Sequence, residues 1–192
     1  MTPPPADRLP AAPADRPTPL IILVAYADSA TRERAQRLSD LLAQAVADEF
    51  AARFSWWKFD FLRDARMFEA AVEEAVRADL LVFAVHAAQP LPRPARRWLD
   101  AWRHQRAQRR RALVALLAGP DPMAAPLAPV HSLLQQAARD AGMEFLPHSF
   151  PLLNETPCCL ANTVSESVHR LTPLLEEILT RHSDLPQWGL NE

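Results

Sequence analysis

Apolar residues along the chain follow two alternating patterns. Short continuous apolar runs rich in branched side chains are typical of strands that are covered on both faces of a sheet. These runs cover residues 19–26, 79–87 and 112–119, and the more polar segment MEFLPHSF, residues 143–150, is predicted as a last short strand. Residues 53–61 instead alternate bulky aromatic with smaller or polar side chains, with one slip at Trp57. Such alternation predicts a fifth strand that lies near a sheet edge.

Between the runs, apolar residues recur every three or four positions, as on one face of a helix. The predicted helices cover residues 30–50, 66–78, about 130–141 and 163–182, and one more begins within the Pro-rich segment 90–105. In that segment Trp98, Leu99 and Trp102 have helical spacing and are predicted to pack inward. Gly142 is predicted to end the fourth helix.

Five strands that alternate with five helices predict an α/β fold with a parallel sheet and helices on both faces. Right-handed crossovers and central placement of the most apolar strands favour the order 2-1-3-4-5, a three-layer, doubly wound arrangement. Residues 1–19 hold seven prolines and no apolar stretch, which predicts a disordered arm. We therefore expect one domain over residues 20–182 and a separate C-terminal tail over residues 183–192.

Composition narrows the classes of function. The formal net charge of -2 argues against nucleic acid or an anionic membrane as a general partner. No apolar run is long enough to span a membrane, and the adjacent Cys158 and Cys159 form no disulfide framework, so a cytoplasmic location is expected. The six histidines have no ligand spacing, which argues against a metal site. Lys58 is the only lysine, so any chemistry that needs an amine depends on it.

In a doubly wound sheet, ligands bind beyond the carboxyl ends of the strands, where the strand order reverses. The polar side chains predicted to line this crevice come from four places in the chain. They are Asp28, Ser29, Thr31 and Arg32 after the first strand, His86, Gln89 and Arg93 after the third, Asp121 after the fourth, and His148 of the fifth.

The segment SATRERA, from Ser29 to Ala35, resembles the phosphate loop S-x-T-G-N-T of flavodoxins, with Ser29 and Thr31 at the hydroxyl positions. The segment AVHAAQPLPRPARRWLDAW is similar to the flavin-covering loop and next helix of flavodoxins and NADPH-dependent FMN reductases. The resemblance implies a flavodoxin-like fold over most of residues 20–150. It also implies an FMN whose phosphate is bound by Ser29, Thr31 and Arg32, with residues 86–93 against the flavin ring.

The loop also departs from the flavodoxin pattern. Arg32 replaces the glycine and Glu33 the asparagine, and no glycine occurs between residues 1 and 118. Glycine allows the close backbone approach that a phosphate cradle needs. The favoured interpretation is that Asp28 or Ser29 caps the first helix, with Glu33 in its first turn. Under the alternative, Arg32 points into the crevice and binds an anion.

Two further classes of protein fit the residues poorly. A phosphorylated receiver domain shares the fold, but His86 stands where a receiver has its phosphorylated aspartate, and no lysine lies near residue 148. A receiver-like interaction domain that is not phosphorylated stays open. A hydrolase that pairs a serine with His86 or His148 lacks a G-x-S-x-G elbow, and the sequence assigns no group to orient the histidine.

Two surface features remain without an assigned role. The run from Arg96 to Arg111 holds seven arginines and one acid, and we interpret it as a solvated helix face rather than a nucleic-acid site. In the tail, Trp188 and Leu190 pack either on the domain or on a partner.

Together these patterns predict a non-catalytic, cytoplasmic, flavodoxin-like or receiver-like module for protein interaction or small-ligand sensing. Its expected partners are another protein, a second copy of the chain in a homodimer, or a small ligand. No cofactor is expected. The alternative is an FMN-dependent NAD(P)H oxidoreductase with an atypical phosphate loop.

Overall fold

The computed structural model describes residues 19–47, 51–105, 110–119 and 128–151. Its sheet is five-stranded and parallel, with the order β2-β1-β3-β4-β5. The strands are β1 (Leu20–Tyr26), β2 (Ala52–Lys58), β3 (Leu80–His86), β4 (Ala112–Gly119) and β5 (Glu144–Pro151). The predicted fold class and strand order are therefore confirmed, with β3 at the centre of the sheet and β2 at one edge.

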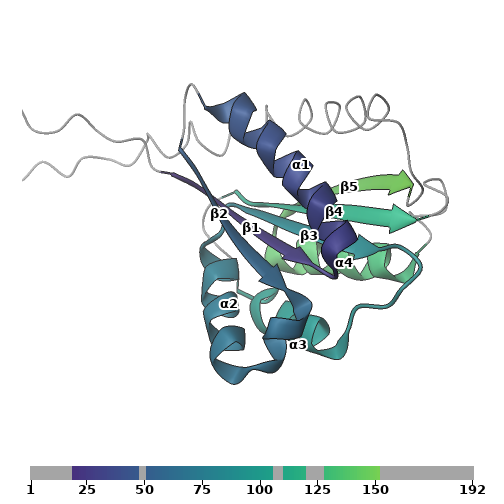
Figure 1. The fold of residues 1–192 in the computed structure, drawn as a ribbon. Helices are drawn as coiled ribbons and strands as arrows, with labels where there is room; N and C mark the ends of the chain where they lie inside the picture. Colours follow the sequence, from purple (N-terminus) through teal and green to yellow (C-terminus); the bar gives the residue numbers. More distant parts are fainter. Residues whose placement is uncertain (1–18, 48–50, 106–109, 120–127, 152–192) are drawn as a thin grey trace, which may run out of the picture.

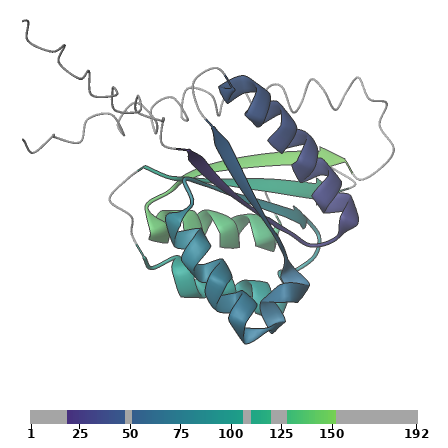
Figure 2. The same ribbon diagram turned by 60° about the vertical axis from the view of Figure 1, so that its left-hand side comes forward.

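Among the described residues, four α-helices connect these strands, and they cover both faces of the sheet (Figures 1 and 2). They are α1 (Ser29–Val46), α2 (Ala65–Arg77), α3 (Arg93–Trp102) and α4 (Pro129–Ala141). Among the described helices, α1 lies on one face and α2, α3 and α4 lie on the other (Figure 1). The predicted arm 1–19, except for Pro19, the last predicted helix 163–182 and the tail 183–192 lie outside the described residues.

Each face of the sheet buries its own core. On the α1 side, Leu38 and Leu42 pack on Ile22, Val24 and neighbouring strand residues. On the other side, the aromatic rings of Phe83 and Trp98 have centroids 5.5 Å apart. Trp98 and Trp102 are fully buried, so the prediction that they pack inward is confirmed.

The predicted strand 53–61 is wrong at its C-terminal end, because β2 stops at Lys58 and residues Phe59–Arg63 form the 3₁₀ helix η1. Phe59 and Leu62 are buried three positions apart, as the threefold repeat of a 3₁₀ helix requires. The predicted slip at Trp57 is also absent. Trp56 packs on the α1 side and Trp57 on the α2 side, so the strand keeps regular alternation.

Two charged side chains are buried at the amino-terminal end of the sheet. Arg111 is 2% exposed, and its Nε donates to the carbonyl oxygen of Ala78 over 2.8 Å, while its Nη2 donates to that of Ala75. These carbonyls belong to the C-terminal end of α2, where a cation is favourable. Asp79 accepts a hydrogen bond from the backbone of Ile21. The last arginine of the basic run is therefore a buried helix cap and not part of a solvated face.

Candidate functional site

The carboxyl ends of β1 and β3 bring together two of the predicted site residues. The strands are neighbours, and the backbone bond from Ala27 to Ala84 extends their pairing past Tyr26. Asp28 follows directly, and its Oδ2 lies 2.6 Å from Nε2 of His86. The His86 side chain is 14% exposed and that of Asp28 46% exposed, so the pair is open to solvent on the Asp28 side.

Asp28 is also the N-cap of α1. Its Oδ1 accepts from the backbone N–H of Thr31 over 2.9 Å, and its own N–H donates to Oγ1 of Thr31 over 3.0 Å. This reciprocal capping box satisfies two backbone donors, and Thr31 is fully buried in it. Ser29 is the exposed first residue of the helix. Glu33 is the fifth, so it lies just beyond the first turn where it was expected.

The hydrogen bonds that the Asp28 carboxylate accepts from Thr31 and His86 set its electrostatics. Burial by itself would raise the pKa of Asp28, but the hydrogen bonds from Thr31 and His86 outweigh it and lower that pKa below its usual range. A carboxylate can only accept, so Nε2 of His86 carries the proton in the bond. In a neutral ring, Nδ1 is then the atom that can accept a proton from a ligand. Asp28 supplies the orienting group for His86 that the sequence did not assign.

Arg32 is engaged with the edge strand. Its guanidinium carbon lies 5.6 Å from the centroid of the Trp56 ring, within the range of a cation–π contact. The ring of Tyr26 packs edge-on against the same Trp56, with centroids 6.3 Å apart. Arg32 therefore lies against β2, rather than presenting a free guanidinium at the start of α1.

The remaining predicted site residues are dispersed. The backbone of Gln89 closes a turn onto His86, and its side chain is exposed, as is that of Arg93 at the start of α3. His148 lies within β5, three strands from β1, which is about 14 Å at the usual strand spacing. Asp121 lies outside the described residues.

One ion pair near this edge was not predicted from the sequence. Lys58 at the end of β2 bonds Asp60 of η1 over 2.8 Å. The hydrogen bond to Asp60 raises the pKa of Lys58, and Lys58 in turn lowers the pKa of Asp60. The signal in the sequence was local, since Lys58 and Asp60 are two positions apart, and the order 2-1-3 places the end of β2 beside the end of β1.

We tested whether this loop fits the phosphate of an FMN. A phosphate at a helix N-terminus uses the free backbone N–H groups and the positive end of the dipole. Here the carboxylate of Asp28 already holds the N–H of Thr31, and the hydroxyl of Thr31 is buried in the capping box. The residues therefore do not fit a flavodoxin-type phosphate site. Within the described residues, no three His, Cys, Asp or Glu side chains gather as metal ligands, and none of the helices has both the length and the apolarity to cross a membrane.

Comparison with known proteins supports the architecture. The sequence matches no protein-family model, and no curated protein matches it by sequence. Among solved structures, an oxidoreductase from Corynebacterium diphtheriae is similar over 83% of this chain and 98% of its own, with a TM-score of 0.66 and 15% identity. A short-chain flavodoxin associated with a bacterial microcompartment is similar over 84% of this chain and 98% of its own, with a TM-score of 0.55 and 14% identity.

A third similar structure is the apo form of an NADH:FMN oxidoreductase, which covers 80% of this chain and 89% of its own, with a TM-score of 0.55 and 16% identity. At such identities the likeness concerns the course of the backbone and not the site residues. The chain therefore has a flavodoxin-like fold, related at the level of architecture to flavodoxins and FMN reductases.

Proposed function

We propose that this chain is a non-catalytic, cytoplasmic binding module built on a flavodoxin-like fold. The observation that carries the proposal is the position of the Asp28 carboxylate, which caps α1 where a flavodoxin-type loop would receive a phosphate. The same carboxylate is bonded to His86. The Asp28 carboxylate thus occupies the place at the start of α1 where a flavodoxin-type loop would bind the phosphate.

Charge explains why this arrangement opposes FMN. A carboxylate and a phosphate a few ångströms apart repel each other by about 1 kcal/mol in water and more in a partly buried site. Because the pKa of Asp28 is lowered, the carboxylate stays ionised at neutral pH. Moving it aside would break the capping box and the bond to His86 together.

Features of the same end of the molecule support binding. The Asp28–His86 pair is open to solvent on the Asp28 side and presents a carboxylate, bonded to an imidazole, to a small polar ligand. Among the described residues, Phe61 of η1 and Met67 of α2 are large apolar side chains that are 54% and 49% exposed, and we propose them as contacts for another protein. We propose a protein partner, a second copy of the chain, or a small ligand as the bound species.

The fold favours one alternative, an FMN-dependent NAD(P)H oxidoreductase. Both an oxidoreductase and an NADH:FMN oxidoreductase are among the similar structures. Such an enzyme would have to bind FMN without using the start of α1 to bind its phosphate group. Binding of FMN distinguishes the oxidoreductase from the non-catalytic binding module.

Quenching of FMN fluorescence by the full chain tests the proposal, together with NADH and NADPH oxidation in the same mixture. We expect no saturable quenching and no FMN-dependent oxidation. The variant Asp28→Ser replaces the capping carboxylate with a hydroxyl, which can still accept at the N-cap but carries no negative charge, so any gain of FMN binding should appear there. Glu33→Gln, which removes a nearby exposed charge outside the cap, is the matched control. Saturable FMN binding by the unmodified chain, with reduced-nicotinamide oxidation, would overturn the proposal.

Light scattering on the eluting protein tests the partner half of the proposal. If the exposed pair of side chains joins two copies, Phe61→Asp should convert a dimer to a monomer, while Arg37→Gln on α1 should not. A chain that is monomeric, and whose His86 signals do not respond to any small ligand or partner tested, would leave the module without a bound species.

A further inference from the structure

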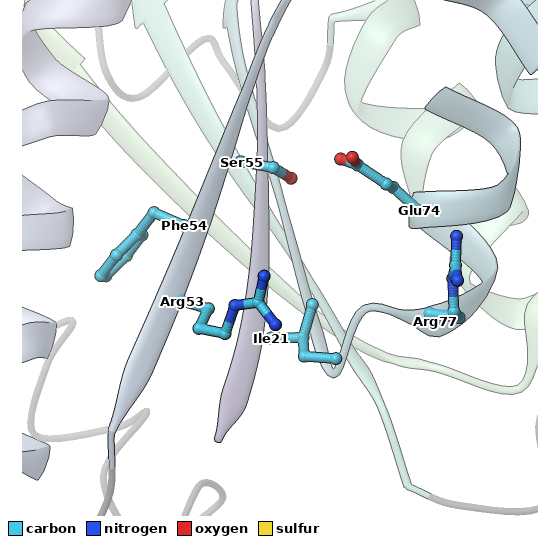
Figure 3. A pocket seen from close by; sticks show the side chains of 6 residues that line it. All are labelled: Ile21, Arg53, Phe54, Ser55, Glu74 and Arg77. Carbon is cyan, nitrogen blue, oxygen red and sulfur yellow. The ribbon is translucent and has the colours of Figure 1, made fainter. Parts of the chain in front are cut away.

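A second polar site lies far from the Asp28–His86 pair, in a hollow of about 270 Å³ between β2 and α2. Arg53 and Ser55 of β2, Glu74 and Arg77 of α2 and Ile21 of β1 line it (Figure 3). Residues 21 and 53 are register partners near the amino ends of their strands. The hollow is thus at the opposite end of the sheet from the site described above, and the inference below does not depend on the proposed function.

Arg53 and Glu74, which carry opposite charges, face this hollow without pairing with each other. The Arg53 guanidinium extends beside Ile21, while the hydroxyl of Ser55 and the carboxylate of Glu74 point toward one another (Figure 3). Among the described residues, neither an ion pair nor a hydrogen bond joins Arg53 to Glu74. The hollow therefore presents a cation on one side and an anion on the other.

Glu74 is held in position by one oxygen and leaves the other for a ligand. Its Oε2 accepts from the indole Nε1 of Trp57 over 2.8 Å. This bond spans from β2 to α2 and orients the carboxylate. Trp57 packs against the core on the α2 side, so its indole is a fixed donor. A second donor, such as an ammonium group, can then bond Oε1 without disturbing Oε2.

Arg77 adds positive charge at the rim. Its Nη2 lies 3.3 Å from Oε2 of Glu73, and its Nε donates to the carbonyl oxygen of the same residue. Arg77 is thereby kept beside the hollow, where its field favours an anion. The apolar wall of Ile21 lies below the guanidinium of Arg53 (Figure 3).

We propose that this hollow binds a small zwitterion of the amino-acid class. Its carboxylate pairs with Arg53 and the hydroxyl of Ser55, its ammonium donates to Oε1 of Glu74, and its side chain contacts Ile21. The volume is below the range of about 300–1,000 Å³ typical of pockets for drug-sized ligands, so the ligand is of single-amino-acid size. The charges of the hollow favour a zwitterion, since its carboxylate neutralises Arg53 and its ammonium neutralises Glu74.

Three probes that share one carbon skeleton test this chemistry. L-leucine carries both charged groups, 4-methylpentanoate has the carboxylate alone, and 3-methylbutylamine has the ammonium alone. The readout is the ¹⁵N–¹H signal of the Trp57 indole in the full chain, assigned with Trp57→Phe. We expect saturable shifts with leucine and binding about tenfold weaker for each one-headed probe, as the loss of one charged hydrogen bond predicts.

Matched variants separate the two walls. Arg53→Gln should weaken the binding of leucine and of 4-methylpentanoate about tenfold, and Arg53→Glu, which adds repulsion, should weaken both further. Glu74→Gln keeps an acceptor for Trp57 and should remove the preference for leucine over 4-methylpentanoate. Arg37→Gln, an exposed arginine on α1, should change nothing. The variants are first checked for an unchanged amide spectrum.

The proposal is overturned if millimolar leucine leaves the Trp57 signal unshifted. It is also overturned if Arg53→Gln binds leucine like the unmodified chain, or if 4-methylpentanoate binds as tightly as leucine. None of these results bears on FMN, and FMN binding would not affect this site.

Discussion

His86 at the end of β3 and Asp28 just after β1 are joined by a hydrogen bond of 2.6 Å between Nε2 and Oδ2. The other oxygen of the same carboxylate accepts from the backbone N–H of Thr31. One side chain therefore connects the start of α1 to a neighbouring strand. The capping role and the contact with His86 can be separated by substitution.

Loss of the cap should destabilise the fold. We expect Asp28→Ala to lower the free energy of unfolding by about 0.5–2 kcal/mol, because the N–H groups at the start of α1 lose their acceptor. Asp28→Asn keeps an acceptor and should cost less. Urea unfolding followed by circular dichroism measures both. The control Glu33→Gln should stay within about 0.5 kcal/mol of the unmodified chain. If Asp28→Ala and Glu33→Gln changed the free energy of unfolding equally, the capping role of Asp28 would be contradicted.

The lowered pKa of Asp28 makes a signed prediction for pH. A carboxyl group with a depressed folded pKa contributes stability above its unfolded pKa of about 4, and this contribution is lost as pH falls through the folded value. The unmodified chain should therefore lose its advantage over Asp28→Asn as the pH falls from about 5 to about 2. Urea unfolding across this range checks it. A difference that grows toward low pH would contradict the prediction.

A double-mutant cycle should detect the contact between the two side chains. We expect Asp28→Ala and His86→Ala to show a coupling of about 0.5–1.5 kcal/mol, a modest value because the Asp28 side chain is 46% exposed. The measurement is the free energy of unfolding of both single variants and the double variant. Costs that add to within about 0.3 kcal/mol would show that the bond contributes no coupling.

Arg111 should be among the more sensitive positions of the described chain. It is buried and donates to two carbonyls at the end of α2, so Arg111→Met should cost about 2–4 kcal/mol. Arg111→Lys keeps the charge without the forked donor geometry and should restore only part of the loss. Thermal and urea unfolding measure the series. Substitution of the exposed Arg96, Arg96→Met, is the control. If Arg111→Met lowered the free energy of unfolding no more than Arg96→Met, the capping of α2 by Arg111 would be contradicted.

Gly142 ends α4 in the left-handed conformation, with φ 68°. A Cβ built there meets nothing within 4 Å, so the cost of Gly142→Ala is conformational and not steric crowding. We expect a loss of about 1 kcal/mol, and a smaller loss for Gly142→Asn, which tolerates this conformation. Urea unfolding checks the order. An alanine variant as stable as the unmodified chain would contradict it.

Much of this architecture is encoded locally. The apolar runs and the helical spacing of residues such as Leu38 and Leu42 predict strands and helices, because burial of one face depends on period alone. Alternation of the two patterns then restricts the strand order, since crossovers are right-handed. The cap at Asp28 could be predicted for the same reason, because a capping residue acts on the backbone next to it.

Other features depend on residues far apart in sequence. The partner of Asp28 is 58 positions away, and the donor to Glu74 comes from another element, so no local pattern indicates either. Arg111 belongs to a basic run that the sequence predicts as a solvated helix face. The structure instead buries it against the C-terminal end of α2. The strand after Ser55 was predicted to run on to Phe61, but Phe59 and Leu62 are buried by a 3₁₀ turn instead.

The sequence by itself thus determined the five strands, their order and the four described helices that connect them, and it narrowed the cap on α1 to Asp28 or Ser29, because periodicity and backbone capping act over a few residues. Only the tertiary structure decided which charges meet: Asp28 with His86, Arg111 with the end of α2, and Arg53 facing Glu74 without pairing. Those meetings depend on strand order and helix placement acting together. For that reason the segment that resembled a phosphate loop proved to be a helix N-terminus capped by its own carboxylate.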